Sequence, residues 1–380
     1  MKNLIFCFDG TSNDPSDSTE EKTSTGGIKD SSISNVLKMH LLFGGDLHDG
    51  NAHGLPQLSL YYSGVGTYGS KIKQLFNAGL SLKDPGRIIN DATEDLLKHY
   101  EAGDKIFIFG FSRGAAIARK FASILKNEIS EKYKIRFLGL FDTVASIGMP
   151  DLNTDEKASS DVQFENRTVS GNVKEALHLC SIDDKRKAFQ PTLMNTESRI
   201  TEIWFSGAHS DVGGSYHRDG LSDNTLRFML DELERRKLGI STVAASEIKY
   251  KQINAATKGV EIEFDDIVIE PNVFGKNHQQ SRGWYLKWTL YDRSVVVMEK
   301  DKITRKKPKI HHSVAERIYG DIDYRPIGLK KAKHTILYQD NTDNDFENLS
   351  HHIRIGMRSL RPLDIGESIV VPVMAHQFHN

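Results

Sequence analysis

Residues 105–125, KIFIFGFSRGAAIARKFASIL, decide how this chain folds. After its lysine, segment 105–109 is apolar, aromatic and β-branched, as in a buried strand. Residues 115–125 are rich in good helix formers, with apolar side chains at helical spacing. Between them lies a Gly-x-Ser-x-Gly pentapeptide at 110–114. A strand, this pentapeptide and a helix, in that order, form the context of a nucleophile elbow.

The elbow interpretation explains the residues of the pentapeptide. In so tight a turn, side chains at 110 and 114 would collide with neighbouring backbone, which accounts for glycine at both positions. The hydroxyl of Ser112 is then presented at a helix N-terminus, where the helix dipole favours developing negative charge. The alternative is a glycine-bracketed turn with an idle serine. The flanking strand and helix favour the elbow.

The composition describes an ordinary soluble globular protein. Of 380 residues, 38% are hydrophobic and 27% are charged. A formal net charge of −1 argues against a general nucleic-acid binder. The two cysteines, Cys7 and Cys180, are far apart and indicate neither a disulfide scaffold nor a zinc site. We therefore expect no nucleic-acid partner, no cofactor and a fold compatible with a reducing compartment.

No apolar run is long enough to span a bilayer, and the first residues do not form a secretory signal. The apolar start is typical of a first buried strand. We expect a cytoplasmic protein, or one exported by a route that needs no signal peptide.

Alternating strand and helix patterns predict the fold class. The expected strands are apolar almost throughout, as in a parallel sheet covered on both faces: 3–9, 59–64, 105–111, 135–142 and 200–206. The expected helices lie between or after them: 33–43, 86–100, 113–130, 172–181 and 222–237. This alternation predicts a three-layer α/β-hydrolase-like fold with a mostly parallel central sheet.

Several segments depart from this alternation. Residues 10–32 and 149–171 are polar and poorly periodic, and we interpret them as inserted loop, lid or cap segments. We expect a strand with aromatics at 284–290. The basic run 303–309 is expected at a solvated hairpin tip, with contact to acidic lipid headgroups as the alternative. We assign 1–330 to the catalytic domain and 331–380 to a C-terminal extension.

A serine nucleophile needs a base, and that base needs a partner that holds its tautomer. Loops after parallel strands converge on one sheet edge, so acids and histidines there are the candidates. Asp142 ends one apolar strand, and His209 follows another, ahead of Asp211 and a glycine pair expected to let backbone pass close to a ligand. The order Ser112, Asp142, His209 is that of α/β-hydrolases.

Other assignments stay open at this point. An aspartate at a strand end often caps the next turn, and the chain has 15 histidines. Asp211 is the main rival of Asp142 for orienting the base. His311 and His312 are the main rivals of His209, since a late histidine also fits the hydrolase order.

An oxyanion hole needs two main-chain donors. One should be the N–H of Arg113, the residue after the nucleophile. The other should come from a loop after a neighbouring strand, and the segment that begins at Asp9 provides Gly10 or Thr11. A plain turn at this segment is an equal alternative.

These blocks together resemble the catalytic domain of the type VI secretion phospholipase effectors, in the lipase-effector family with a GxSxG elbow. The matching blocks occur in the family's order: 8–13, 61–67, 103–104 leading into 110–115, 141–144, 204–214, and later 310–314 with 324–326. The match covers roughly residues 1–330.

The resemblance implies an α/β-hydrolase fold, a lipase or phospholipase-type esterase activity, and a triad at Ser112, Asp142 and His209. The expected partner is a lipid or other ester substrate, with membrane-surface contact. We expect the chain to depart from secreted members in lacking a long membrane-anchoring region after the hydrolase domain. A role inside the producing cell is therefore an equal expectation.

Two other functions compete with the serine esterase. A metal-dependent phosphohydrolase could ligate a cation through Asp9, Asp142, His209 and Asp211, although Cys7 replaces the first acid of a D-x-D-G-T motif. A structural calcium ion at the acidic 9–17 segment is a further alternative. A hydrolase-like binding scaffold ranks last, because all three triad members are present in order.

Overall fold

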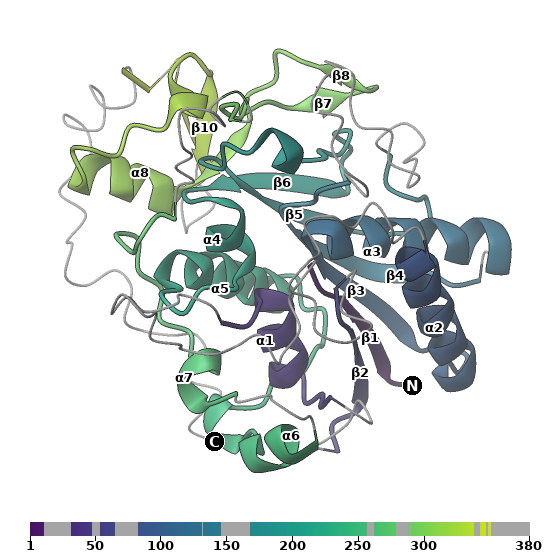
Figure 1. Cartoon of the computed structure of the whole chain (residues 1–380). Helices are drawn as coiled ribbons and strands as arrows, with labels where there is room; N and C mark the ends of the chain where they lie inside the picture. The colour runs from purple at the N-terminus through teal and green to yellow at the C-terminus, as the bar shows by residue number, and fades with distance from the viewer. Residues whose placement is uncertain are drawn as a thin grey trace.

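The computed structural model of the chain describes residues 1–10, 32–47, 54–64, 83–130, 132–145, 168–256, 262–278, 288, 290–337, 343–346 and 349–350. Within these residues, nine strands form one sheet (Figure 1). From edge to edge the strands are β11 (Asp343–Phe346), β10 (His334–Leu337), β9 (Lys309–His311), β6 (Ile200–Phe205), β5 (Ala176–Ser181), β4 (Ile135–Phe141), β3 (Lys105–Phe111), β1 (Asn3–Phe8) and β2 (Gln57–Tyr62).

Every neighbouring pair in this sheet is parallel except β10 and β11, which pair antiparallel at one edge. In a parallel sheet the carboxyl ends of the strands share one edge, so the loops that leave β3, β4, β5 and β6 meet there. The topology therefore brings together groups that are distant in sequence.

Helices cover both faces of the sheet, as Figure 1 shows. On one face α1 (Asn35–Leu42) and α5 (Gly220–Arg235) pack on the strands in one apolar cluster. On the other face α2 (Lys83–His99) and α3 (Ser112–Ile124) pack in a second cluster. The strands are buried on both faces, which confirms the predicted three-layer α/β fold with a mostly parallel sheet.

A third apolar cluster extends the core toward β9 and β10, where α8 (His312–Gly320) packs. The remaining α-helices in the described residues are α4 (His209–Gly213), α6 (Tyr250–Ala256) and α7 (Phe264–Ile267). A separate hairpin is formed by β7 (Met298–Glu299) and β8 (Lys302–Ile303). The C-terminal third therefore adds strands to the same sheet.

The helix predicted at 172–181 is wrong. Residues 176–181 form β5, a central strand paired with β4 and β6. The segment contains only six consecutive buried residues, and periodicity cannot distinguish so short an apolar run from a piece of buried helix. The neighbouring strands β4 and β6 determine the conformation, because both pair with this segment and so require it to be extended.

The other irregular segments have mixed outcomes. Of the strand predicted at 284–290, only 288 and 290 are described, and Leu290 makes an isolated bridge to Arg186. Most of the segments at 10–32 and 149–171 lies outside the described residues. The basic run 303–309 begins in β8 and ends in β9, so it does not form the hairpin tip, and the turn of the hairpin is formed by Lys300 and Asp301.

In the described part of the chain, no helix combines the length and the apolar character required to cross a membrane.

We expect Leu177→Ala in β5 to destabilise the protein by about 2–5 kcal/mol, because it opens a cavity beneath a central strand. The side chain of Leu177 is fully buried. The matched control is Leu97→Ala on α2, where the leucine is 56% exposed and the change should stay within about 0.5 kcal/mol. Urea unfolding followed by circular dichroism measures both, and equal midpoints would contradict the central position of β5.

Candidate active site

Ser112 lies where β3 ends and α3 begins, and its backbone is left-handed, with φ 56°. This conformation is disfavoured for a residue with a side chain and occurs where surrounding structure enforces it. A Cβ atom at Gly110 would lie 2.6 Å from Cα of Ala115, and one at Gly114 would lie 2.2 Å from the main-chain oxygen of Asp9. The predicted backbone collisions at 110 and 114 are therefore present.

The turn after β6 positions His209, the first residue of α4. Gly207 has φ 110°, and a Cβ atom there would lie 2.4 Å from Cβ of Asp211. Asp211 caps α4, since its Oδ2 accepts the N–H of Ala208 at 2.8 Å. The strand end, the glycine and the cap together fix where the imidazole lies.

The glycine pair at the C-terminal end of α4, Gly213 and Gly214, lies in closely packed surroundings. A Cβ atom at Gly213 would lie 1.9 Å from the ring of Phe111, and one at Gly214 would lie 2.5 Å from the main-chain nitrogen of Asn35. Asn35 in turn donates to the carbonyl of Val212. The close contacts at these glycines are thus made with α1 and the elbow strand, whereas the sequence predicts an approach to a ligand.

Ser112, His209 and Asp142 form a continuous hydrogen-bonded chain. His209 Nε2 lies 2.7 Å from Ser112 Oγ, and His209 Nδ1 lies 2.5 Å from Asp142 Oδ2. All three residues are buried, and Ser112 is 5% exposed. The imidazole packs against the rings of Phe111 and Phe189, with centroids 4.7 and 5.0 Å away. The ring is therefore held by apolar contacts as well as by its two polar neighbours.

Asp142 is fully buried at the end of β4, with φ 39°. Arg293 grips the carboxylate with two bonds: Nη1 to Oδ1 at 2.6 Å and Nη2 to Oδ2 at 2.8 Å. The N–H of Ser181 also donates to Oδ1, at 3.0 Å. With His209 on Oδ2, this buried charge is fully hydrogen-bonded.

The electrostatics favour an ionised acid beside a neutral base. Burial alone would raise the pKa of Asp142, but the guanidinium of Arg293 and the hydrogen bond to His209 outweigh it and hold this pKa well below its ordinary value. Burial lowers the pKa of His209, and its hydrogen bond to Asp142 opposes that shift only in part. Near neutral pH the imidazole can therefore accept a proton at Nε2.

The main-chain N–H groups expected to form the oxyanion hole differ in whether they already have an acceptor. The N–H of Arg113 lies in the first turn of α3, where main-chain N–H groups have no intrahelical acceptor. The N–H of Gly10 donates to Asp9 Oδ1 at 2.6 Å. Thr11 lies outside the described residues. The buried Asp9 also accepts the hydroxyl of Tyr61, so this side chain anchors the loop after β1.

The rival residues lie in other networks. Asp211 Oδ1 lies 2.5 Å from Nδ1 of His278.

His311 caps the N-terminus of α8 and stacks on the ring of Phe205, with centroids 4.4 Å apart. His312 is 2.8 Å from a carboxylate oxygen of Glu316. The structure thus places Asp142 beside His209, and gives the rivals different partners.

Among the described residues, one group of potential metal ligands lies close together: His178, Cys180 and Glu202. His178 Nε2 accepts the N–H of Thr143 at 3.0 Å, so Nδ1 carries the hydrogen that faces Glu202 Oε1 at 2.8 Å. Both ring nitrogens of His178 and Oε1 of Glu202 therefore already have hydrogen-bond partners. The four ligands expected for a phosphohydrolase are not among this group.

Two residues of the site, Arg293 and Asp184, are not indicated by any sequence pattern. Asp184 Oδ2 accepts the N–H of His209 at 3.2 Å and binds Arg186, which stacks over Phe189 at 3.5 Å. Neither residue belongs to a motif. The one available signal was that a carboxylate buried at a strand end needs a cation, and the sequence does not say which of its many lysines and arginines comes near.

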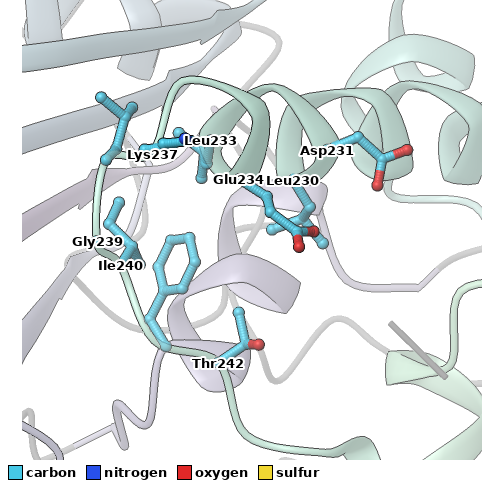
Figure 2. A pocket seen from close by; sticks show the side chains of 10 residues that line it. Leu230, Asp231, Leu233, Glu234, Lys237, Gly239, Ile240 and Thr242 are labelled. Atoms are coloured by element: carbon cyan, nitrogen blue, oxygen red, sulfur yellow. The ribbon is translucent and has the colours of Figure 1, made fainter. Parts of the chain in front are cut away.

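A hollow of about 220 Å³ has none of the residues described above in its lining. Its wall is formed by the C-terminal half of α5, the segment 237–242 and Phe43. Leu230, Leu233 and Ile240 supply apolar surface, while Asp231 and Glu234 also line it, as Figure 2 shows. Ser112 and His209 do not line this hollow, so it has no part in the arrangement described above.

Comparison with known proteins agrees with the sequence resemblance. Residues 2–129 and 124–232 match the family model described as type VI secretion system phospholipase effector Tle1-like, catalytic domain. The uncharacterized protein YEL023C of Saccharomyces cerevisiae is 25% identical over 248 residues, covering 50% of this chain and 32% of the yeast protein.

Two solved structures are also similar. One is the Tle1 effector bound to the VgrG spike of the type 6 secretion system, with 22% identity, 57% of this chain and 51% of that chain covered, and a TM-score of 0.38. The other is an uncharacterized protein from Pseudomonas aeruginosa, with 20% identity, 61% and 45% covered, and a TM-score of 0.37. The chain spans about a third of the yeast relative and about half of each solved chain.

We expect Gly114→Ala to cost roughly 1–3 kcal/mol of stability and to lower any activity that depends on Ser112, because the added methyl group would press on the backbone of Asp9. Gly86→Ala in α2 is the matched control. A Cβ atom there has nothing within 4 Å, and alanine favours a helix. Thermal unfolding compares the two, and a Gly114→Ala protein as stable as the control would show that the crowding is relieved at no cost.

Proposed function

The chain belongs to the Tle1-like family of type VI secretion phospholipase effectors, through its catalytic domain, and on this premise we propose that it is a serine hydrolase of lipid carboxylic esters. The observation that carries the proposal is the chain of two hydrogen bonds from Ser112 through His209 to Asp142. A nucleophile, a base and an orienting acid at such distances are what acyl transfer requires.

The proposed first step is attack by Ser112. Oγ adds to the ester carbonyl carbon while its proton passes to His209 Nε2. Asp142 accepts the Nδ1 hydrogen of His209, keeps the ring in the tautomer that leaves Nε2 free, and stabilises the imidazolium that forms. The N–H of Arg113 stabilises the oxyanion. As second donor we propose Thr11, or Gly10 once its N–H leaves Asp9 Oδ1.

His209 acts next as an acid, and then again as a base toward water. His209 gives its proton to the departing alcohol oxygen, and the acyl group stays on Ser112. A water molecule then loses a proton to His209 Nε2 and attacks the acyl carbonyl. His209 returns this proton to Ser112 Oγ as the acyl–oxygen bond breaks, which releases the fatty acid and restores the serine hydroxyl. The neutral state of His209 near neutral pH supports its role as base in both halves.

The proposed substrate class rests on membership of the family. A phospholipase acts at a lipid surface, so we propose contact with a membrane surface and lipid esters as substrates. Because the family consists of secretion effectors, we also propose export without a signal peptide. Phospholipid vesicles of defined headgroup and acyl position would identify the bond that is cleaved.

We expect Ser112→Ala to lower ester hydrolysis by about 10⁴-fold or more while the protein stays folded, because the nucleophile is lost. Ser123→Ala on the same helix is the control and should retain activity. A fluorophosphonate probe should label the wild-type protein at Ser112, as mapped by mass spectrometry. Hydrolysis that survives Ser112→Ala and disappears with a chelator would instead indicate metal-dependent chemistry.

Replacing the two candidate bases separates them. His209→Asn should remove nearly all activity, because no group then takes the proton from Ser112. His311→Asn should leave activity close to that of the wild type, since asparagine also caps a helix N-terminus. Initial rates with a p-nitrophenyl ester measure both variants, and full activity in His209→Asn would overturn the assignment.

A further inference from the structure

Arg293 reaches the sheet edge from the C-terminal third of the chain. It lies between the isolated bridge of Leu290 and strand β7, and is 2% exposed. The N–H of Tyr291 donates to the carbonyl of Lys185 at 2.6 Å, which ties this segment to the loop after β5. A Cβ atom at Gly328 would lie 3.0 Å from the carbonyl oxygen of Arg293, so the opposite side is closely packed as well.

The guanidinium of Arg293 is fixed at both ends of its fork. Beyond its two bonds to Asp142, Nη1 donates to the carbonyl of Ser181 at 2.8 Å and Nη2 to that of Phe189 at 2.5 Å. A planar fork with parallel donors suits a carboxylate, and a lysine ammonium cannot reproduce it. Asp142 Oδ2 is shared by Arg293 and His209, so the plane of the guanidinium determines which way this oxygen faces the imidazole.

The charges around His209 balance only when Arg293 is present. Asp142 is neutralised by Arg293, and Asp184 by Arg186 at 2.6 Å. Cys180 lies near Arg293, and burial raises the pKa of its thiol well above the ordinary value, so it stays neutral. Without Arg293 the site would keep one uncompensated negative charge beside the imidazole, and the Asp142–His209 pair would hold a proton to higher pH.

We infer that Arg293 is a positioning residue for the reaction: its fork aims the Asp142 carboxylate at His209, and its charge balances that of this carboxylate beside the imidazole. The inference rests on the proposed serine hydrolase function and goes beyond it. Arg293 lies outside residues 2–232 that match the family model, so a segment beyond the matched domain completes the site.

The test is the pH dependence of kcat/KM for a p-nitrophenyl ester in wild type, Arg293→Gln and Arg293→Lys. Because His209 must be neutral to act as base, kcat/KM falls as the pH drops through the pKa of the Asp142–His209 pair. Removal of the positive charge raises that pKa. In Arg293→Gln we therefore expect this acid limb to move up by about 1–3 pH units. A merely structural role would lower rates at all pH values without moving the limb.

Arg293→Lys separates charge from geometry. It keeps the charge, so the acid limb should stay within about 0.5 pH unit of the wild type, while loss of the fork should lower kcat at the plateau about tenfold or more, as expected for a misplaced catalytic group. If Arg293→Gln does not fold, Arg293→Lys still tests the positioning role. A wild-type plateau in Arg293→Lys overturns the positioning role, and an unmoved limb in a folded Arg293→Gln overturns the role of the charge.

Arg317→Gln is the matched control. Arg317 is also buried and donates to the carbonyls of Val273 and Gly275, without contact to Asp142. Its limb should coincide with that of the wild type. Fluorophosphonate labelling of the wild-type protein tests the serine hydrolase function independently of Arg293. Absence of label at Ser112 defeats the proposed function, whereas a labelled enzyme with an unmoved limb in Arg293→Gln defeats only the role of the Arg293 charge.

Discussion

The burial of one ionised carboxylate constrains the whole sheet edge. Asp142 has no exposed surface, and an isolated charge in such a place would cost many kcal/mol. It is tolerated because donors from three other segments reach it: Ser181 at the end of β5, His209 after β6 and Arg293 before β7. Any rearrangement that withdrew one donor would leave the charge short of a partner. The relative positions of these strands and loops are therefore tied to one side chain.

The elbow depends on packing in the same way. A left-handed Ser112 is unfavourable by itself, and the surrounding backbone holds it in place. Gly114 lies against the main chain of Asp9, at the end of β1, and the carbonyl of Ser112 accepts the N–H of Val144 at 3.1 Å. The loops after β1 and β4 thus brace the turn between β3 and α3. The serine is strained locally and stabilised by its neighbours.

The C-terminal third is joined to this edge through carboxylates. Arg293 binds Asp142, His278 binds Asp211, and Tyr324 donates its hydroxyl to the buried Asp183 at 2.8 Å. Asp183 also accepts the N–H of Gly207 at 2.7 Å, next to the turn that carries His209. Each acid follows a strand of the central sheet. The later segments therefore do more than cover the domain, because they supply the donors that these acids need.

Sequence by itself was sufficient for the elbow, the fold class and the choice of Ser112, Asp142 and His209 as candidates. These depend on local patterns, namely a buried strand, glycines that backbone crowding demands, and polar residues directly after apolar strands. Local pattern was insufficient at 176–181, where the same apolar spacing suits a strand or a helix.

Only the tertiary structure decided that this segment is a central strand, that Asp211 pairs with His278, and that Arg293 neutralises Asp142. Those outcomes depend on which residues meet across long stretches of chain. Such contacts follow from strand order and from the charge balance of the folded interior, and no spacing along the sequence contains them.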